Sequence, residues 1–298
     1  MHHDEVDVDE ALVARLLDRQ FPELADRPLT IVEPWGTDHA VWRLGDDLVV
    51  RLPRIDWAAS QPEREARWLP ILAPHLPVAV PTPVALGTPD LGYPFPWAVH
   101  RWLPGTLATP KRIADPVDFA RQLADVVVSL RGVPTDDAPP ARGRARPLAD
   151  YDAATRDAIE RCCDLVDTAA ALTVWEDALA APPFDGPGGW VQGDLDGNCL
   201  VDGGRLSGLV DWGSACAGDP AVDVAVVWST LFTDRSGEAF LDAVRPDEAT
   251  IRRARGAVVS QACMALPYYR GTYPLIVERS RHKLERLGVA TFDGSWTC

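Results

Sequence analysis

Lysine, cysteine and long apolar runs are all scarce in this sequence, and each shortage narrows the range of functions. Lys111 and Lys283 are the only lysines, and with the arginines they make 29 basic residues against 44 acidic ones, a formal net charge of −15. Nucleic-acid binding requires a basic surface, which this composition does not supply. No apolar stretch approaches the roughly 18 residues that a membrane-spanning helix needs. We therefore expect no nucleic-acid partner and no membrane partner.

The 6 cysteines are scattered, and no CxxC pair is present, so a metal site built on thiolates is not expected. The acidic N-terminus lacks the basic region and apolar core of a secretion signal. These features predict a cytoplasmic protein with reduced thiols. The acidic balance also favours a cationic ligand over an anionic one, although acidity more often serves solubility.

The first hundred or so residues have the pattern of an antiparallel sheet with helices packed on it. Helical spacing of apolar residues is found over 7–21 and again over 61–72, despite Pro70. Strand-like runs lie at 29–33, 40–44, 48–52 and 97–102, and the stretch 77–89 reads as extended.

After Gly105 the pattern becomes mostly helical. Helices are predicted over 116–131 and 151–180, with a short strand pair within 190–212 and further helices from about residue 220. The simplest organisation is an N-terminal domain over 1–104 and a C-terminal domain over 105–298. The expected fold class is α+β, with a small antiparallel β-sheet lobe and a larger, mostly helical lobe.

The densest group of chemically active residues lies in 190–228. Two apolar runs flank a Gly-rich turn, which predicts a hairpin. With the turn centre at Gly204–Arg205, Asn198 would face Asp211 across the ladder. An amide oxygen and a carboxylate are hard ligands suited to Mg²⁺, and Asp194 just upstream could accept a proton from a hydroxyl. Singly, each residue is more often a turn former or a helix cap, but their combination favours a site.

Here the sequence resembles the aminoglycoside phosphotransferase family, a branch of the protein-kinase-like fold. Three elements recur in order and carry the resemblance: Gln192-Gly193-Asp194-Leu195 with Asn198, then Val210-Asp211-Trp212-Gly213, then GDPAVDVA over 218–225. The resemblance implies Asp194 as catalytic base, Asn198 and Asp211 as Mg²⁺ ligands, and Asp223 as an anchor of the catalytic loop. Two departures from the family pattern are Gln192 in place of the usual His and a loop one residue shorter, which could bring Asp196 to the site instead of Asp194.

The same resemblance extends to the N-terminal part of the chain and implies how a nucleotide is held. Arg51 stands where kinases place their phosphate-binding lysine, and Glu65 on the next helix would be its ion-pair partner. Gly36 and Thr37 lie where a nucleotide-covering loop would be, although an ordinary hairpin turn fits nearly as well. The backbone of the hinge would bind the adenine ring; its residues are His100, Arg101, Trp102 and Leu103.

The sequence thus predicts an enzyme that uses ATP or GTP with Mg²⁺ to phosphorylate a hydroxyl of a small molecule. An antibiotic acceptor, aminoglycoside-like or another polyhydroxy compound, would make it a resistance enzyme. A metabolic kinase for an amino alcohol, sugar or amino acid would use the same residues. The third hypothesis is a weakened or inactive nucleotide-binding protein, which Gln192 and the short loop favour and the presence of Asp194, Asn198 and Asp211 disfavours.

Overall fold

The computed structural model describes residues 5–33, 36–186 and 188–290 and divides the chain into two compact units. The first unit is Met1–Gly105 with Gly208–Gly213, and the second is Thr106–Ser207 with Ser214–Cys298. The sequence predicts a single boundary at 104/105, which assigns residues 208–213 to the C-terminal domain. The structure places this segment in the first unit, which matters for the site below.

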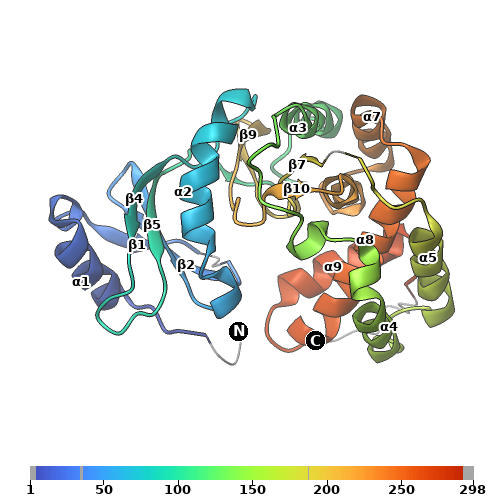
Figure 1. Cartoon of the computed structure of the whole chain (residues 1–298), viewed down its shortest axis with the longest axis horizontal. Helices are drawn as coiled ribbons and strands as arrows, with labels where there is room; N and C mark the ends of the chain where they lie inside the picture. The colour runs from blue at the N-terminus through green and yellow to red at the C-terminus, as the bar shows by residue number, and fades with distance from the viewer. Residues whose placement is uncertain (1–4, 34–35, 187, 291–298) are drawn as a thin grey trace. The chain divides into compact units, whose positions relative to one another are not determined.

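The first unit is built on a five-stranded antiparallel sheet in the order β1-β2-β3-β5-β4 (Figure 1). Strands β2 and β3 pair along their whole length, from His39 opposite Pro53 to Leu44 opposite Leu48. The turn between them has Gly45 at a φ of 61°, a conformation that glycine adopts without strain. The strands are β1 (Leu29–Ile31), β2 (His39–Leu44), β3 (Leu48–Pro53), β4 (Pro83–Gly87) and β5 (Trp97–Arg101).

Two helices lie on opposite sides of this sheet (Figure 1). Helix α1 (Glu10–Gln20) begins at its N-cap Asp9, whose carboxylate accepts a hydrogen bond from the backbone N–H of Leu12 at 2.7 Å. Its apolar face joins the core of the sheet, which includes Leu16, Trp42 and Trp97. Helix α2 (Gln61–Leu72) packs against β4 and β5 and buries Glu65 as well as its apolar residues.

The second unit is mostly helical, as its sequence pattern predicts. Its longest helix, α8 (Glu248–Tyr269), packs against α4, α5 and α9, and α3 packs against α7. The predicted helical stretch 151–180 divides into α4 and α5, because Asp167 starts a new helix as its N-cap. The remaining helices of this unit are α3 (Pro116–Arg131), α4 (Asp152–Arg161), α5 (Thr168–Ala180), α6 (Ala221–Val224), α7 (Asp234–Val244) and α9 (Pro274–Arg286).

Two small sheets accompany these helices, one of β7 with β10 and one in the order β6-β8-β9. The strands are β6 (Thr106–Leu107), β7 (Gly189–Val191), β8 (Cys199–Asp202), β9 (Arg205–Leu209) and β10 (Cys216–Gly218). The predicted hairpin is present as β8 and β9, but its turn is Gly203–Gly204, both at positive φ. Two consecutive residues at positive φ make the tight hairpin turn that glycines favour. The predicted register, which rested on a turn centre at Gly204–Arg205, therefore does not hold.

Within the described residues, none of the helices combines the length and the apolar character needed to cross a bilayer.

Candidate active site

A buried ion pair between Arg51 and Glu65 lies at the centre of the first unit. Nη1 of Arg51 on β3 donates to both carboxylate oxygens of Glu65 on α2, at 2.7 Å each. The two side chains are only 12% and 2% exposed. Burial alone would lower the pKa of Arg51, but the charges of Glu65 and Asp211 raise that pKa above its usual value. The ion pair predicted from the sequence is therefore present, and these charges keep Arg51 protonated.

Asp211 is the third member of this charged group. Its Oδ1 lies 3.3 Å from Nη2 of Arg51, and its side chain is 38% exposed. Its backbone has a φ of 57°, the left-handed conformation that is uncommon outside glycine and often marks a functional residue. Burial of the carboxyl would raise its pKa, but Arg51 outweighs burial and lowers it. Asp211 is thus an anion at neutral pH, partly open to solvent.

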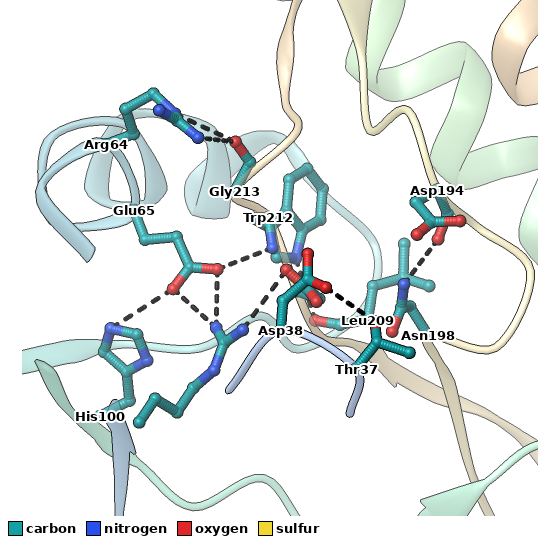
Figure 2. A network of polar contacts seen from close by, with 12 residues as sticks. Thr37, Asp38, Arg64, Glu65, His100, Asp194, Asn198, Leu209, Trp212 and Gly213 are labelled. Atoms are coloured by element: carbon teal, nitrogen blue, oxygen red, sulfur yellow. Dashed lines mark hydrogen bonds and ion pairs between the residues drawn. The ribbon is translucent and has the colours of Figure 1, made fainter. Parts of the chain in front are cut away.

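The chain beside Asp211 is tied to the first unit by backbone contacts. The N–H of Trp212 donates to Oε1 of Glu65 at 2.8 Å, and Arg64 donates to the carbonyl of Gly213 from Nε at 3.0 Å and Nη2 at 2.7 Å (Figure 2). Upstream, the N–H of Leu209 donates to the carbonyl of Ala79 at 2.9 Å. These contacts explain why 208–213 belongs with the first unit, and they fix Asp211 beside Arg51.

Two buried histidines lie in the same charged group. Burial, with Arg51 adding to it, lowers the pKa of His39 to about 4 and that of His100 to about 3, so both are neutral at pH 7. Nε2 of His100 is 3.9 Å from Oε2 of Glu65 (Figure 2). Neutral histidines leave Arg51 as the group that balances Glu65 and Asp211.

Two of the backbone N–H groups of the predicted hinge already donate hydrogen bonds within the first unit. The N–H of Arg101 donates to the carbonyl of Thr82 at 2.9 Å, and that of Trp102 donates to the carbonyl of Asp47 at 2.8 Å. The His100 side chain is fully buried and turned toward Glu65. Of the predicted hinge donors beyond the strand, the N–H of Leu103 makes no hydrogen bond to any residue that the structure describes. Leu103 is therefore the predicted hinge residue whose N–H remains available to the adenine ring, and the carbonyl groups of 100–103 keep the role predicted for them.

The predicted nucleotide-covering loop is described from Gly36 onward, while Trp35 lies outside the described residues. Thr37 donates from Oγ1 to Oδ1 of Asp38 at 2.8 Å (Figure 2). Trp57 donates from Nε1 to Oδ2 of Asp38 at 3.1 Å. A Cβ built on Gly36 would meet nothing within 4 Å. Asp38, which belongs to the same predicted loop, organises this turn.

In the second unit, the residues 192–198, here called the 192–198 loop, are anchored at their start by Asp223. This carboxylate is 1% exposed and accepts hydrogen bonds from the N–H groups of Gln192 at 2.9 Å and Gly193 at 2.8 Å. Burial raises the pKa of Asp223 against the opposing effect of these bonds. They are the anchoring contacts that the resemblance implied. Gln192 contributes in turn, because its Oε1 accepts from the N–H of Asp194 at 2.7 Å.

Asp194 and Asn198 are joined to each other within this loop. Nδ2 of Asn198 donates to the backbone carbonyl of Asp194 at 2.7 Å (Figure 2). The amide oxygen of Asn198 accepts no hydrogen bond from the residues that the structure describes, so it is available as a ligand atom. The Asp194 side chain is 34% exposed and forms an ion pair with Arg144, in the short helical turn Gly143–Ala145. Arg144 lies in a loop that carries no motif, so no signal along the chain indicated this contact.

Asp196 is held in a different way from Asp194. Its Oδ2 lies 2.6 Å from Nζ of Lys283 on α9, and the two side chains are 11% and 16% exposed. Burial would raise the pKa of the Asp196 carboxyl, but the charge of Lys283 and its hydrogen bond lower it. Asp194 is therefore the more accessible carboxylate of the loop. Sequence reasoning did not single out Lys283 as a site residue. Its identity as one of the two lysines in the chain was a signal that could have indicated it.

The two predicted Mg²⁺ ligands belong to different units, Asp211 to the first and Asn198 to the second. No group of three or more His, Cys, Asp or Glu side chains that could hold a metal ion is found in the described part of the chain. The available donors are a partly exposed carboxylate on Asp211 and an amide oxygen on Asn198. These are hard oxygen atoms, and Mg²⁺ is commonly held by one or two such protein ligands together with phosphate oxygens. The chemistry of each donor, taken by itself, therefore fits Mg²⁺.

Comparisons with solved structures give the same fold over nearly the whole chain. A complex of APH(2")-IIia with GDP and kanamycin has a TM-score of 0.74 and 17% identity, covering 93% of this chain and 98% of that chain. The streptomycin–ATP–APH(2")-IIa ternary complex has a TM-score of 0.62 and 17% identity, covering 94% and 97%. Macrolide 2'-phosphotransferase MphH from Brachybacterium faecium has a TM-score of 0.57 and 25% identity, covering 91% and 98%. These likenesses confirm the predicted α+β, protein-kinase-like fold.

At the level of sequence, no curated protein gives a significant match. A family model described as the phosphotransferase enzyme family, APH, does match residues 31–256. This range contains both the Arg51–Glu65 pair and the 192–198 loop. The chain belongs to the APH phosphotransferase enzyme family.

Proposed function

We propose that this protein transfers the γ-phosphate of ATP or GTP, with Mg²⁺, to a hydroxyl of a small polyhydroxy antibiotic in the cytoplasm, and so confers resistance to it. One observation carries the proposal: a single buried guanidinium, Arg51, contacts Glu65 at 2.7 Å and Asp211 at 3.3 Å. This arrangement gives a fixed cation for phosphate oxygens directly beside a metal-binding carboxylate. Phosphoryl transfer is accelerated chiefly by such positioning and charge neutralisation.

The first unit would hold the nucleotide. Arg51 would bind phosphate oxygens through the edge of its guanidinium, which suits bidentate contacts to phosphate. The N–H of Leu103 would meet the purine ring. Thr37 would cover the phosphates from the turn that Asp38 organises. Mg²⁺ held by Asp211 and Asn198 would supply neutralisation of the negative charge on the phosphates.

Asp194 would act on the acceptor. Its carboxylate is partly exposed, while its backbone is fixed on one side by Gln192 and on the other by Asn198. A carboxylate held in this way can accept a hydrogen bond from the acceptor hydroxyl and take its proton as the phosphoryl group is transferred. Arg144 would hold Asp194 in place until an acceptor hydroxyl arrives.

The local charge at the loop bears on the class of antibiotic. The whole chain is acidic, which by itself favours a cationic acceptor. Around the 192–198 loop, however, Arg144 and Lys283 each pair with a carboxylate, and Arg279 adds a third cation. This surface would not attract a polycation. As the phosphoryl acceptor we therefore rank a sugar hydroxyl of a macrolide first and an aminoglycoside second. The 25% identity to the macrolide enzyme supports this order.

The test is a coupled screen for ADP or GDP release, run with ATP and with GTP, in the presence and absence of Mg²⁺. The panel contains erythromycin, kanamycin, gentamicin, streptomycin, a nucleoside antibiotic, choline and simple sugars. We expect release to rise with a macrolide, and mass spectrometry to show one phosphoryl group added to it. Turnover of choline or sugars alone would make the protein a metabolic kinase. Nucleotide binding without turnover of any kind would make it an inactive relative.

A further inference from the structure

The 192–198 loop is anchored at both ends by contacts that do not involve Asp196 or Gly197. At the start, Asp223 binds the N–H groups of Gln192 and Gly193. At the end, the chain enters β8, which pairs with β6 through Leu200 and Val201. Between these points the backbone includes Gly197 at a φ of 99°, a conformation that does not resist movement by itself. A further contact to Asp196 or Gly197 is therefore needed if the side chains of this part of the loop are to be placed accurately.

Helix α9 provides that third contact. Lys283 reaches Asp196 at 2.6 Å, with both side chains largely buried. One helical turn earlier, Arg279 lies over Gly197: a Cβ built on this glycine would come within 2.4 Å of Nη1 of Arg279. Two basic residues of one helix therefore contact two adjacent residues of the loop. Contacts at i and i+4 fall on one face of a helix, so both can reach the loop together.

The residue at 283 is a lysine in a chain that uses arginine almost everywhere else. An ammonium is a compact point charge, whereas a guanidinium is a broad planar fork. With the guanidinium of Arg279 already above Gly197, the compact ammonium fits beside it and still reaches Asp196. The choice of residue and the geometry thus agree on a specific contact.

We propose that Lys283 is a positioning residue, which acts through Asp196 to fix the 192–198 loop against α9. The hydrogen bond from Asn198 to the carbonyl of Asp194 spans Asp196, so movement of Asp196 moves both of these residues together. Lys283 therefore sets where the Asp194 carboxylate and the Asn198 amide lie relative to the rest of the second unit. Its effect on catalysis rests on the function proposed above for these two residues, whereas its effect on loop order does not.

Hydrogen exchange of the whole protein tests the contact without any assumption about the reaction. We compare wild type with Lys283→Met, Asp196→Asn and the double variant, using Lys111→Met as the matched control because Lys111 is the other lysine and is exposed. We expect peptides covering 193–198 to exchange about tenfold faster or more in the three loop variants, because the loop opens locally. Unchanged exchange in Lys283→Met and Asp196→Asn would overturn the proposal.

Loss of stability alone must be separated from loss of positioning. Lys283→Met leaves a buried carboxylate without its partner, which is destabilising, whereas the double variant removes both charges. We expect the double variant to regain most of the lost thermal stability but to keep the fast loop exchange. Recovery of slow exchange in the double variant would show that Lys283 serves stability only. Lys283→Arg retains the charge but brings a second broad guanidinium beside that of Arg279, so we expect only part of the protection to return.

The kinetic measurement uses nucleotide turnover with the best acceptor of the screen, or with water if no acceptor is found. Misplacement of catalytic groups by about 1 Å can cost up to a hundredfold, so we expect kcat to fall between about tenfold and a hundredfold in Lys283→Met. The KM for nucleotide should change by less than about threefold, because the nucleotide-binding residues lie elsewhere. A large rise in KM with kcat retained would mean that Lys283 binds nucleotide directly, and would overturn the positioning role. If the wild type shows no activity but the variants still exchange faster over 193–198, the proposed function is refuted and the positioning role of Lys283 stands.

Discussion

Arg51 and Asp211 lie 3.3 Å apart, from Nη2 to Oδ1, although 160 positions of the sequence separate them (211 − 51). The same guanidinium binds both oxygens of Glu65 through Nη1. One side chain therefore links β3, α2 and the chain beside Trp212. This linkage fixes a cation beside the carboxylate that we propose as an Mg²⁺ ligand before any nucleotide arrives, which is the preorganisation that phosphoryl transfer requires.

Replacing Arg51 by lysine tests this linkage. A lysine keeps the charge but has a single ammonium, which cannot contact Glu65 and Asp211 through separate edges as the guanidinium does. We expect Arg51→Lys to stay folded, to bind nucleotide about tenfold more weakly and to turn over more slowly, since one charge-assisted bond contributes about 1.5 kcal/mol. Isothermal titration with ATP and with GTP measures the affinity, and an unchanged affinity would make Arg51 a purely structural residue.

Asp211→Asn tests the metal-ligand assignment. The amide keeps the size of the side chain but loses the charge that the Arg51 contact maintains at neutral pH. We expect phosphotransfer to fall by more than about a hundredfold, because a metal ion contributes several kcal/mol of charge stabilisation in the transition state. The matched control is Asp202→Asn, an exposed aspartate at the β8–β9 turn, which should behave as wild type. Activity of Asp211→Asn within about threefold of wild type at saturating Mg²⁺ would contradict the assignment.

Asp194→Ala tests the acceptor-side base. We expect kcat to fall by about a hundredfold or more, in the range of general-base losses, while nucleotide affinity stays nearly unchanged. Asp185→Ala, at an exposed aspartate of the second unit, is the control. Equal activity of Asp194→Ala and Asp185→Ala, with acceptor and nucleotide both saturating, would rule out Asp194 as the base.

The two buried histidines predict a dependence of stability on pH. Their folded-state pKa values of about 4 for His39 and about 3 for His100 lie below the unfolded value of 6.5. Below pH 6.5 the unfolded chain binds protons that the folded chain does not, so stability is full above this pH and falls as the pH drops toward the folded pKa values. Between pH 7 and pH 5 we expect each histidine to remove about 2 kcal/mol from the unfolding free energy.

Urea denaturation at the two pH values measures this effect. The decrease between pH 7 and pH 5 should be smaller in His39→Gln and in His100→Gln than in wild type. The exposed His75 offers the control, and His75→Gln should keep the full decrease. An equal decrease in all four proteins would mean that the buried histidines are protonated in the folded state as readily as in the unfolded one.

Several elements followed from the sequence because their causes are local. The apolar spacing of 61–72 and 116–131 produced helices with those bounds, and the glycine at position 45 closed the turn between two strands. The pairing of Arg51 with Glu65 was also predictable, because the family resemblance implies a basic residue on this strand and an acidic partner on the following helix. The hairpin was predicted, but its turn was misplaced by one residue, since Gly203, Gly204 and Arg205 allow more than one two-residue turn.

Other features were decided only by the tertiary structure. The sequence by itself pointed to Asp194, Asn198 and Asp211 as the candidates for the chemistry, because they occur in recognisable local motifs. It did not show that Asp196 is held by Lys283 or that Asp194 pairs with Arg144, since neither partner lies in a motif. Ion pairs of this kind depend on how α9 and the turn Gly143–Ala145 pack beside the loop. Local periodicity is set by neighbouring residues along the chain, whereas such contacts form only after distant segments have buried their apolar faces together.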